Sequence, residues 1–311
     1  MSSREGKRLK TDGVTARISS VGRRGVTVIL QSGEEVSARV AGRVYKEVQP
    51  VTGDSAEVDC SGDVPVVERI LPRHSTLRRS SSHGRDFQII ASNVDTVLAV
   101  VSVKRPAFSH GFLSRVLAAA RWMDIPAKVA VNKIDLQEDD GQETEEIIAV
   151  YGPGGAGYQI FPVSCITGEG MEELWQDLSG STAVLTGPSG AGKTSLVKKY
   201  NPSLDLKIGS LNPRTWKGRH TTVAARLIPL ASDTMVIDTP GLRLFSIDDI
   251  PAESIQFCFP EFDDLTGSCR FNDCLHVSEP RCAVKEAVEE GAVSKLRYDI
   301  YRGFVSEATS S

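Results

Sequence analysis

Three short polar segments, each directly after an apolar run, carry residue types that suit the binding of one nucleotide. N-K-I-D stands at 132–135, G-P-S-G-A-G-K-T at 187–194 and D-T-P-G at 238–241. A conventional GTPase domain begins with its phosphate-binding loop, so the order in this chain is rotated. Three motifs that serve one ligand rarely occur together by chance. The order therefore predicts a circularly permuted GTPase domain.

The glycine-rich segment predicts a phosphate-binding loop because it follows an apolar strand and opens a helix. Its glycines let backbone N–H groups point at the phosphates, and the Lys193 ammonium group adds positive charge beside the β- and γ-phosphates. We expect Lys193 to serve catalysis and the Thr194 hydroxyl to ligate Mg²⁺. The predicted GTP contacts in this segment are Gly187, Pro188, Ser189, Gly190, Ala191, Gly192, Lys193, Thr194 and Ser195.

The other two segments are expected to read the base and the γ-phosphate. The Asp135 carboxylate can accept hydrogen bonds from guanine N1–H and N2–H2, whereas adenine would leave the buried acceptor unpaired. Asn132 is expected to position the loop and the purine edge, and the Lys133 stem to cover a ring face. After the next strand, backbone N–H groups at Ser164 and Cys165 are expected to complete the base pocket. Asp238 is expected to reach Mg²⁺ through water, and the Gly241 N–H group to meet the γ-phosphate.

A cluster of cysteine and histidine predicts a structural metal site near the C-terminus. Its spacing, C-x4-C-x-H-x5-C, offers three thiolates and one imidazole, a closed tetrahedral set that Zn²⁺ favours and that leaves no position open for catalysis. The alternative is a group of buried free cysteines. Cys258 is the spare cysteine, and Cys60 and Cys165 are expected in the core. The predicted metal ligands are Cys269, Cys274, His276 and Cys282.

Composition limits the class of protein. The 311 residues allow two or three domains, and a hydrophobic content of 40% is enough for globular cores. No apolar run reaches the roughly 18 residues of a membrane span, and the first residues lack the apolar stretch of a secretory signal, so we expect a cytoplasmic protein. Residues 1–90 carry 15 Lys and Arg against 11 Asp and Glu, and the remainder carries 21 against 29. The basic part is the expected RNA-binding side.

Periodicity predicts the elements that must position these residues. Up to about residue 71, alternating apolar runs between Gly, Asp and Ser turns predict a five-stranded OB-like barrel, with an SH3-like barrel or a short sandwich as alternatives. Beyond residue 94, strands alternate with helices, as in a mostly parallel sheet covered on both faces. Two short helices split at Gly291 are expected at the end of the chain. The expected strands of the sheet are 94–103, 127–131, 158–163, 183–186, 223–230 and 234–237, and the expected helices are 112–123, 144–151, 171–178 and 192–200.

These patterns divide the chain into four parts. Residues 1–72 are predicted to form an OB-fold RNA-binding domain, 91–247 the circularly permuted α/β P-loop GTPase domain, and 248–311 a helical zinc-binding domain. Between the first two, 73–90 is predicted to be a basic linker. Its Arg78 and Arg79 can contact phosphate, although a solvated connector explains the composition equally well.

The chain resembles the RsgA (YjeQ) family of circularly permuted, ribosome-small-subunit-dependent GTPases. The likeness runs from the barrel to the C-terminus and includes A-S-N-V-D at 91–95, G-R-H-T-T at 218–222, F-P-E-F at 259–262 and the cysteine and histidine cluster. The resemblance implies an OB-fold, a permuted GTPase domain, a C-terminal zinc domain and a late role in maturation of the 30S subunit. This chain has Thr194 where the family usually has Ser, and Val223 where the family usually has Thr.

The residues expected to act on water differ from those of Ras-like proteins. Leu242 follows D-T-P-G where a Ras-like protein has glutamine, and an aliphatic side chain cannot hydrogen-bond the attacking water, so intrinsic turnover should be slow. His220 is the candidate that positions the water, and the resemblance supports it as the switch-I histidine of the family. Under the same resemblance, either Thr221 or Thr222 is the switch-I ligand of Mg²⁺.

The predicted function is GTP hydrolysis by a monomeric late assembly factor of the small (30S) ribosomal subunit. Its expected ligands are GTP and GDP, Mg²⁺, one structural Zn²⁺, and the rRNA of the subunit, which should stimulate turnover. The alternative from another class is a GTP-gated RNA-binding switch with little turnover, in which Leu242 marks lost catalysis. An ATP-dependent kinase is a third hypothesis, which N-K-I-D disfavours.

Overall fold

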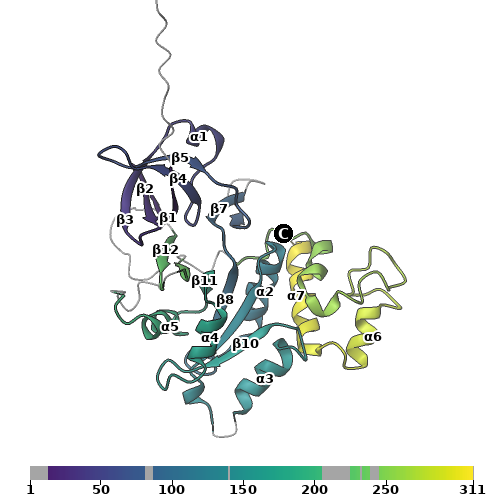
Figure 1. Cartoon of the computed structure of the whole chain (residues 1–311). Coiled ribbons are helices and arrows are strands. Elements are labelled where there is room, and N and C mark those ends of the chain that lie inside the picture. The colour runs from purple at the N-terminus through teal and green to yellow at the C-terminus, as the bar shows by residue number, and fades with distance from the viewer. Residues whose placement is uncertain are drawn as a thin grey trace, which may run out of the picture.

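The structure is a computed structural model that describes residues 13–80, 87–138, 141–204, 225–231, 233–238 and 245–310. An N-terminal barrel, a central sheet flanked by helices and a C-terminal helical unit follow one another along the chain (Figure 1). This arrangement confirms the predicted multidomain fold class. Within the described ranges, no helix is both long and apolar enough to cross a membrane.

The N-terminal strands form a closed barrel in the order β1-β2-β3-β5-β4. Strands β3 and β5 pair in parallel, and the other neighbours are antiparallel. Alternate side chains such as Ile18, Val28 and Val58 are fully buried inside it, which is the period-2 pattern that the sequence showed. Closure confirms the OB-like barrel and excludes the sandwich. The bounds are β1 Val14–Gly22, β2 Gly25–Leu30, β3 Glu35–Val40, α1 Val44–Glu47, β4 Ser55–Asp59 and β5 Val66–Ile70.

A two-stranded antiparallel ribbon lies where we expected an irregular basic linker. It consists of β6 (Thr76–Ser80) and β7 (Phe87–Ser92). Leu77 of β6 and Ala91 of β7 are fully buried in the core of the central domain, and these two inward side chains are hard to detect among the polar residues around them. The Arg78 guanidinium lies over the Phe87 ring, 5.1 Å from its centroid. The segment is therefore an ordered basic ribbon, while the exact domain bounds stay a prediction.

The central sheet has the order β10-β9-β8-β11-β13-β12 and is parallel except for the β12–β13 pair. Its first strand in the chain, β8, lies in the middle, next to the strand that precedes the glycine-rich loop, which is the strand order expected of a permuted domain. The predicted strands and helices agree with the observed ones within about three residues where both are described. The bounds are β8 Thr96–Ser102, α2 His110–Trp122, β9 Ala127–Asn132, η1 Ile134–Leu136, α3 Gln142–Tyr151, β10 Gln159–Val163, α4 Met171–Asp177, β11 Thr182–Thr186, α5 Lys193–Tyr200, β12 Arg226–Pro229 and β13 Met235–Asp238.

Both faces of this sheet are covered by helices, as predicted. Odd-numbered residues of β8, such as Val97 and Val101, pack with α2 and α3, whereas Leu98 and Val100 pack with α4 and α5. Because both faces are buried, β8 reads as a continuous apolar run rather than an alternating one.

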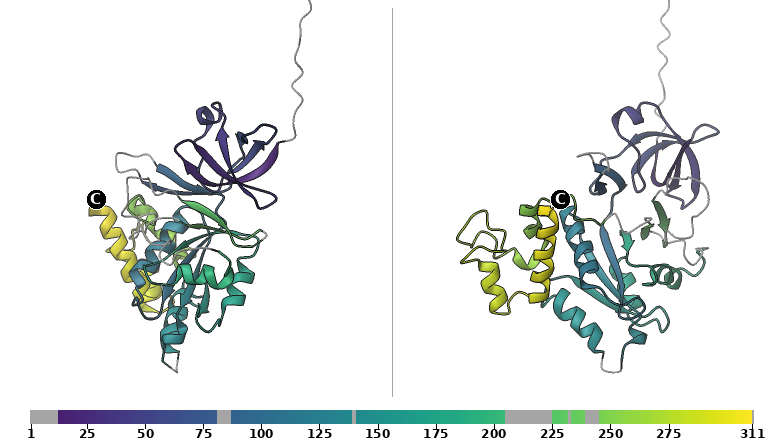
Figure 2. Two further views of the ribbon diagram at one scale, coloured as in Figure 1. Left: turned by 90° about the vertical axis from the view of Figure 1, so that its left-hand side faces the viewer. Right: turned by 180° about the vertical axis from the view of Figure 1, so that it is seen from behind.

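The C-terminal unit packs beside α2, on a different side of the central domain from the barrel (Figure 2). Stacked and edge-to-face rings of Phe259, Phe262 and Tyr301 fill its core. A turn at Gly291 separates α6 from α7, as expected, but α7 is 16 residues long rather than short because buried Tyr298, Tyr301 and Phe304 continue the helical period. The bounds are η4 Ala252–Cys258, η5 Pro260–Phe262, α6 Ala283–Glu289 and α7 Lys295–Ser310.

The barrel is joined to the central domain by specific polar contacts. The Arg17 guanidinium donates to the Gly53 carbonyl at 3.1 Å and to the Thr182 hydroxyl at 3.4 Å. Next to it, the Thr52 hydroxyl donates to the Ala225 carbonyl at 2.8 Å, and Arg226 pairs with Glu35 at 3.2 Å. The barrel therefore contacts the beginning of β12 directly.

Candidate nucleotide and metal sites

The glycine-rich loop lies at the carboxyl end of β11, the edge of a parallel sheet where ligands of this fold class bind. Backbone packing there excludes a side chain at Gly187, because a Cβ would lie 2.0 Å from the Val100 carbonyl oxygen. The Lys193 ammonium group folds back over the loop and donates to the carbonyls of Gly187 at 2.6 Å and Pro188 at 3.0 Å. Thr194 and Ser195 follow in the first turn of α5. The loop has the geometry of an anion cradle at a helix N-terminus.

Lys193 and Asp238 are electrostatically coupled in this site. Asp238 is the last residue of β13, the strand next to β11. Burial raises the pKa of Asp238 to about 6, and the Lys193 charge opposes that rise. Burial likewise lowers the pKa of Lys193, while Asp238 acts in the opposite direction. The predicted phosphate ligand, at the start of α5, and the predicted metal ligand, at the end of β13, therefore lie close enough to influence each other's charge.

The predicted base-reading residues meet the phosphate loop through Asn132. This side chain is 1% exposed, and its Nδ2 donates to the Ala191 carbonyl at 2.8 Å. The neighbouring glycine is required here, because a Cβ at Gly192 would lie 2.1 Å from the Asn132 Nδ2. Two motifs separated by more than fifty residues are thus joined by one buried amide.

A serine hydroxyl orients the carboxylate expected to read guanine. Ser164 donates from Oγ to the Asp135 Oδ1 at 2.5 Å, and the same Oγ accepts from the backbone N–H groups of Ile166 and Thr167 at 3.2 and 3.1 Å. The loop after β10 is therefore fixed against the loop after β9. The sequence predicted that Ser164 would contribute its backbone, but the structure shows that its side chain does the orienting.

Two other predicted base-site residues make polar contacts with neighbouring loops. Lys133 has a left-handed backbone with φ of 66°, and its ammonium group donates to the Arg105 carbonyl. Cys165 is half-buried and donates from Sγ to the Asn132 Oδ1 at 3.4 Å. The prediction that Cys60 is a core residue was wrong, because Cys60 is exposed just after β4, whereas Cys165 packs against the core of the central domain.

Several predicted site residues lie outside the described part of the chain. They are the candidate water-positioning residue, both candidate switch-I ligands of Mg²⁺, the γ-phosphate-sensing glycine and the leucine after it. Their predicted roles stay predictions. These residues are His220, Thr221, Thr222, Gly241 and Leu242.

The four predicted metal ligands come together in the C-terminal unit. Their ligand atoms all lie within 4.8 Å of one another. The Sγ atoms of Cys269 and Cys282 are 3.8 Å apart, and the His276 Nδ1 lies 3.4 and 3.3 Å from them. A Zn²⁺ tetrahedron with Zn–S bonds of about 2.3 Å has edges of roughly 3.8 Å, so the residues fit a zinc ion.

Side chains around the cluster hold its ligands in place. The His276 Nε2 lies 2.9 Å from the Gln256 Oε1, which leaves Nδ1 free to bind metal. Glu279 accepts backbone N–H groups of Leu275, Val277 and Ser278, each at 2.9 Å, and so closes the loop between the ligands. Sequence reasoning missed both residues. Gln256 lies in a separate helical segment, and no spacing rule connects it with His276.

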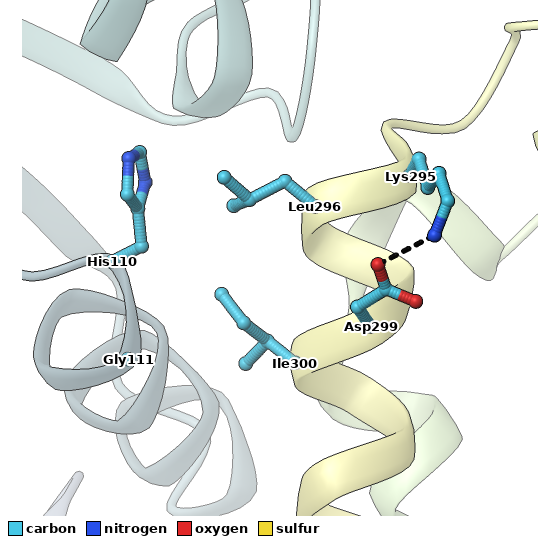
Figure 3. A pocket seen from close by; sticks show the side chains of 6 residues that line it. All are labelled: His110, Gly111, Lys295, Leu296, Asp299 and Ile300. Atoms are coloured by element: carbon cyan, nitrogen blue, oxygen red, sulfur yellow. Dashed lines mark hydrogen bonds and ion pairs between the residues drawn. The ribbon is translucent and has the colours of Figure 1, made fainter.

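A buried arginine side chain joins the C-terminal unit to the central domain. Arg297 of α7 is 1% exposed, and its Nε donates to Glu261 at 2.6 Å while its NH1 donates to the Ser114 hydroxyl of α2 at 2.8 Å. Beside this contact, Leu296 and Ile300 point towards His110 across an open cleft of about 550 Å³ (Figure 3). The Arg297–Glu261 pair lies within the C-terminal unit, and the hydrogen bond from Arg297 to Ser114 connects α7 with α2.

Comparisons with known proteins agree with this geometry. The family model of the RsgA GTPase matches residues 70–248. The small ribosomal subunit biogenesis GTPases RsgA of Shewanella oneidensis and Gemmatimonas aurantiaca are both 38% identical to the chain; the matches span 82% and 88% of this chain and 73% and 91% of the relatives. The crystal structure of YjeQ from Thermotoga maritima superimposes with a TM-score of 0.80 at 31% identity, over 96% of this chain and 99% of that one. YloQ, described as a circularly permuted GTPase, gives a TM-score of 0.75 at 26% identity, over 97% and 98%.

Proposed function

The chain belongs to the RsgA GTPase family, and from this premise we propose that it hydrolyses GTP to GDP and phosphate during maturation of the small ribosomal subunit. The observation that best supports guanine nucleotide binding is the junction at Asn132. There the N-K-I-D loop contacts the phosphate loop, while Ser164 holds Asp135 in the adjoining loop. The predicted phosphate-binding loop and the predicted guanine-reading carboxylate therefore lie in adjoining loops at one edge of the sheet.

Different residues contact different parts of the nucleotide. Asp135 accepts from the guanine edge, and Lys193 and the N–H groups of the glycine-rich loop bind the phosphates. Thr194 and Asp238 are placed to hold Mg²⁺, with Thr221 or Thr222 as the switch-I ligand; the ion supplies charge neutralisation at the β- and γ-phosphates. His220 orients the attacking water.

The pKa of Asp238 predicts a pH limit for Mg²⁺-dependent GTP binding. The carboxylate must be deprotonated to hold a hydrated cation, and its pKa of about 6 lies within the range of ordinary assays. Affinity measured with Mg²⁺ should be constant above that pH and fall by roughly tenfold per unit below it. Calorimetric titrations between pH 5 and 8 measure this profile. Asp238→Asn should give weak, flat binding over the same range; an identical slope in this variant would assign the titration to another group.

Turnover in the presence of small subunits tests the proposed function. Hydrolysis by the isolated protein should be slow and should increase when purified small subunits are added. His220→Ala should lower the stimulated rate by roughly 10²-fold with little change in GTP affinity, because a water-positioning group acts in the transition state. Lys193→Ala should weaken binding and chemistry together.

Absence of stimulation would favour the second candidate, a GTP-gated RNA-binding switch, for which Leu242 after D-T-P-G is the motivating observation. An unchanged stimulated rate in His220→Ala would assign the water-positioning role to another group.

We further propose that the barrel and the ribbon contact rRNA. A cleft of about 540 Å³ on the barrel is lined by Arg23, Arg24 and Arg39, and guanidinium groups suit phosphate. The basic ribbon offers two further guanidinium groups, Arg78 and Arg79. The proposal also includes one structural Zn²⁺, a monomeric state and a cytoplasmic location.

A further inference from the structure

The thiol of Cys165 occupies a position that connects the base loop to the phosphate loop. Its Sγ donates to the Asn132 Oδ1 at 3.4 Å, and the other end of the same amide donates to the Ala191 carbonyl at 2.8 Å. Three loops, after β9, β10 and β11, therefore meet at one buried side chain. None of the roles assigned above uses the cysteine side chain.

The Asn132 amide has two distinct ends, and each end needs a partner because the side chain is 1% exposed. Its Nδ2 faces the phosphate loop, because the Ala191 carbonyl accepts a hydrogen bond from it. The residue after Ala191 is a glycine, and a Cβ there would overlap the Asn132 Nδ2. Its Oδ1 then points at the loop after β10. Among the described residues, the Cys165 thiol is the donor that reaches it.

We propose that Cys165 is a positioning residue for guanine nucleotide binding, which holds the Asn132 amide in the orientation that joins the base loop to the phosphate loop. This inference rests on the proposed function, because it assumes that the pocket binds GTP. The Cys165 side chain then contributes to the affinity for guanine nucleotides and takes no part in the hydrolysis step.

The state of the thiol agrees with this role. Burial raises the pKa of Cys165, so the sulfur stays protonated and remains a donor at neutral pH. An S–H group is a weak donor, and its loss leaves a buried carbonyl oxygen unpaired. The expected effect of removing it is therefore moderate, roughly threefold to tenfold in affinity.

The test compares Cys165→Ala, Cys165→Ser and Asn132→Ala, alone and combined, by direct titration with GTP and GDP. Cys165→Ala should weaken both nucleotides by the same factor, roughly threefold to tenfold, and should raise KM rather than lower kcat. The serine hydroxyl should restore part of the loss. In the Asn132→Ala background, removal of the thiol should have no further effect, because the two residues act as one unit.

Controls separate this inference from the proposed function and from a general loss of stability. Cys60→Ala, in the barrel, should bind like the parent protein, and nucleotide-free Cys165→Ala should unfold within about 4 °C of the parent, which leaves it fully folded at the assay temperature. Parental affinity in Cys165→Ala, or an equal loss with and without Asn132, would overturn the positioning role. A parent protein that binds no GTP would instead refute the proposed function.

Discussion

Asp135→Asn should lower the affinity for GTP by roughly 10²-fold and create affinity for xanthosine triphosphate, as each lost hydrogen bond to a buried group costs about 1–3 kcal/mol. The structure indicates how the new amide will lie. Ser164 donates to the Oδ1 of Asp135, so the amide oxygen should stay towards Ser164 and the Nδ2 should turn towards the base. The Oδ1 can still accept N1–H, which guanine and xanthine both carry, whereas a donor at Nδ2 repels guanine N2–H2 and suits the acceptor at xanthine O2. Competition titrations with GTP, XTP and ATP measure all three affinities.

Ser164→Ala provides the matched control for that experiment. It removes the group that orients Asp135 and leaves the carboxylate in place, so GTP binding should weaken without any gain for XTP. Equal affinity of the parent protein for GTP and ATP would contradict the base-reading role of Asp135.

Removal of zinc should disorder the C-terminal unit while leaving the nucleotide site competent. Purified protein should contain one Zn²⁺ per chain, and structural zinc sites stabilise small units by on the order of 10 kcal/mol. Chelation should therefore increase amide exchange throughout the segment from η4 to α7, because His276 packs against Phe262 and Tyr298 donates to the His276 carbonyl. Mass-resolved hydrogen exchange, with GTP affinity measured in parallel, follows both parts of the molecule.

Gln256→Ala tests the metal site more specifically than chelation does, because it removes a partner of His276 and leaves all four ligands intact. Loss of a hydrogen-bonding partner of a metal-bound histidine typically reduces metal affinity by roughly 10–100-fold. Competition with a chromogenic chelator should show that reduction, and Cys60→Ser should show none. A metal content near zero in protein whose C-terminal unit still exchanges slowly would refute a structural zinc site.

Much of the fold follows from residue patterns within short segments of the sequence. Parallel strands buried on both faces appear as apolar runs, so β8 and β11 were predicted within two residues of their ends. Apolar and polar residues alternate along the barrel strands because one face of each strand is exposed to solvent. This period of two residues predicted all five barrel strands. The metal ligands were predictable for a related reason, since their spacing within a short segment is itself the chemical signal.

Other features depend on contacts between distant segments and leave no local trace. The Asn132–Ala191 contact joins residues 59 apart, and Arg297 meets Ser114 across 183 residues. Only the folded backbone brings those groups together. The β6–β7 ribbon was missed for a different reason, because its first strand, T-L-R-R-S, contains one apolar residue and shows no apolar alternation.

The contact between barrel and sheet has a mechanical consequence. Strand β12 is held on one side by β13, which ends at Asp238, and its first residues are held on the other by Thr52 and Glu35 of the barrel. Ala225 stands three residues after Thr222 of G-R-H-T-T. Under the proposed docking of RNA on the barrel, a load on the barrel is therefore transmitted as mechanical force to Ala225 and β12, next to the strand that ends at Asp238.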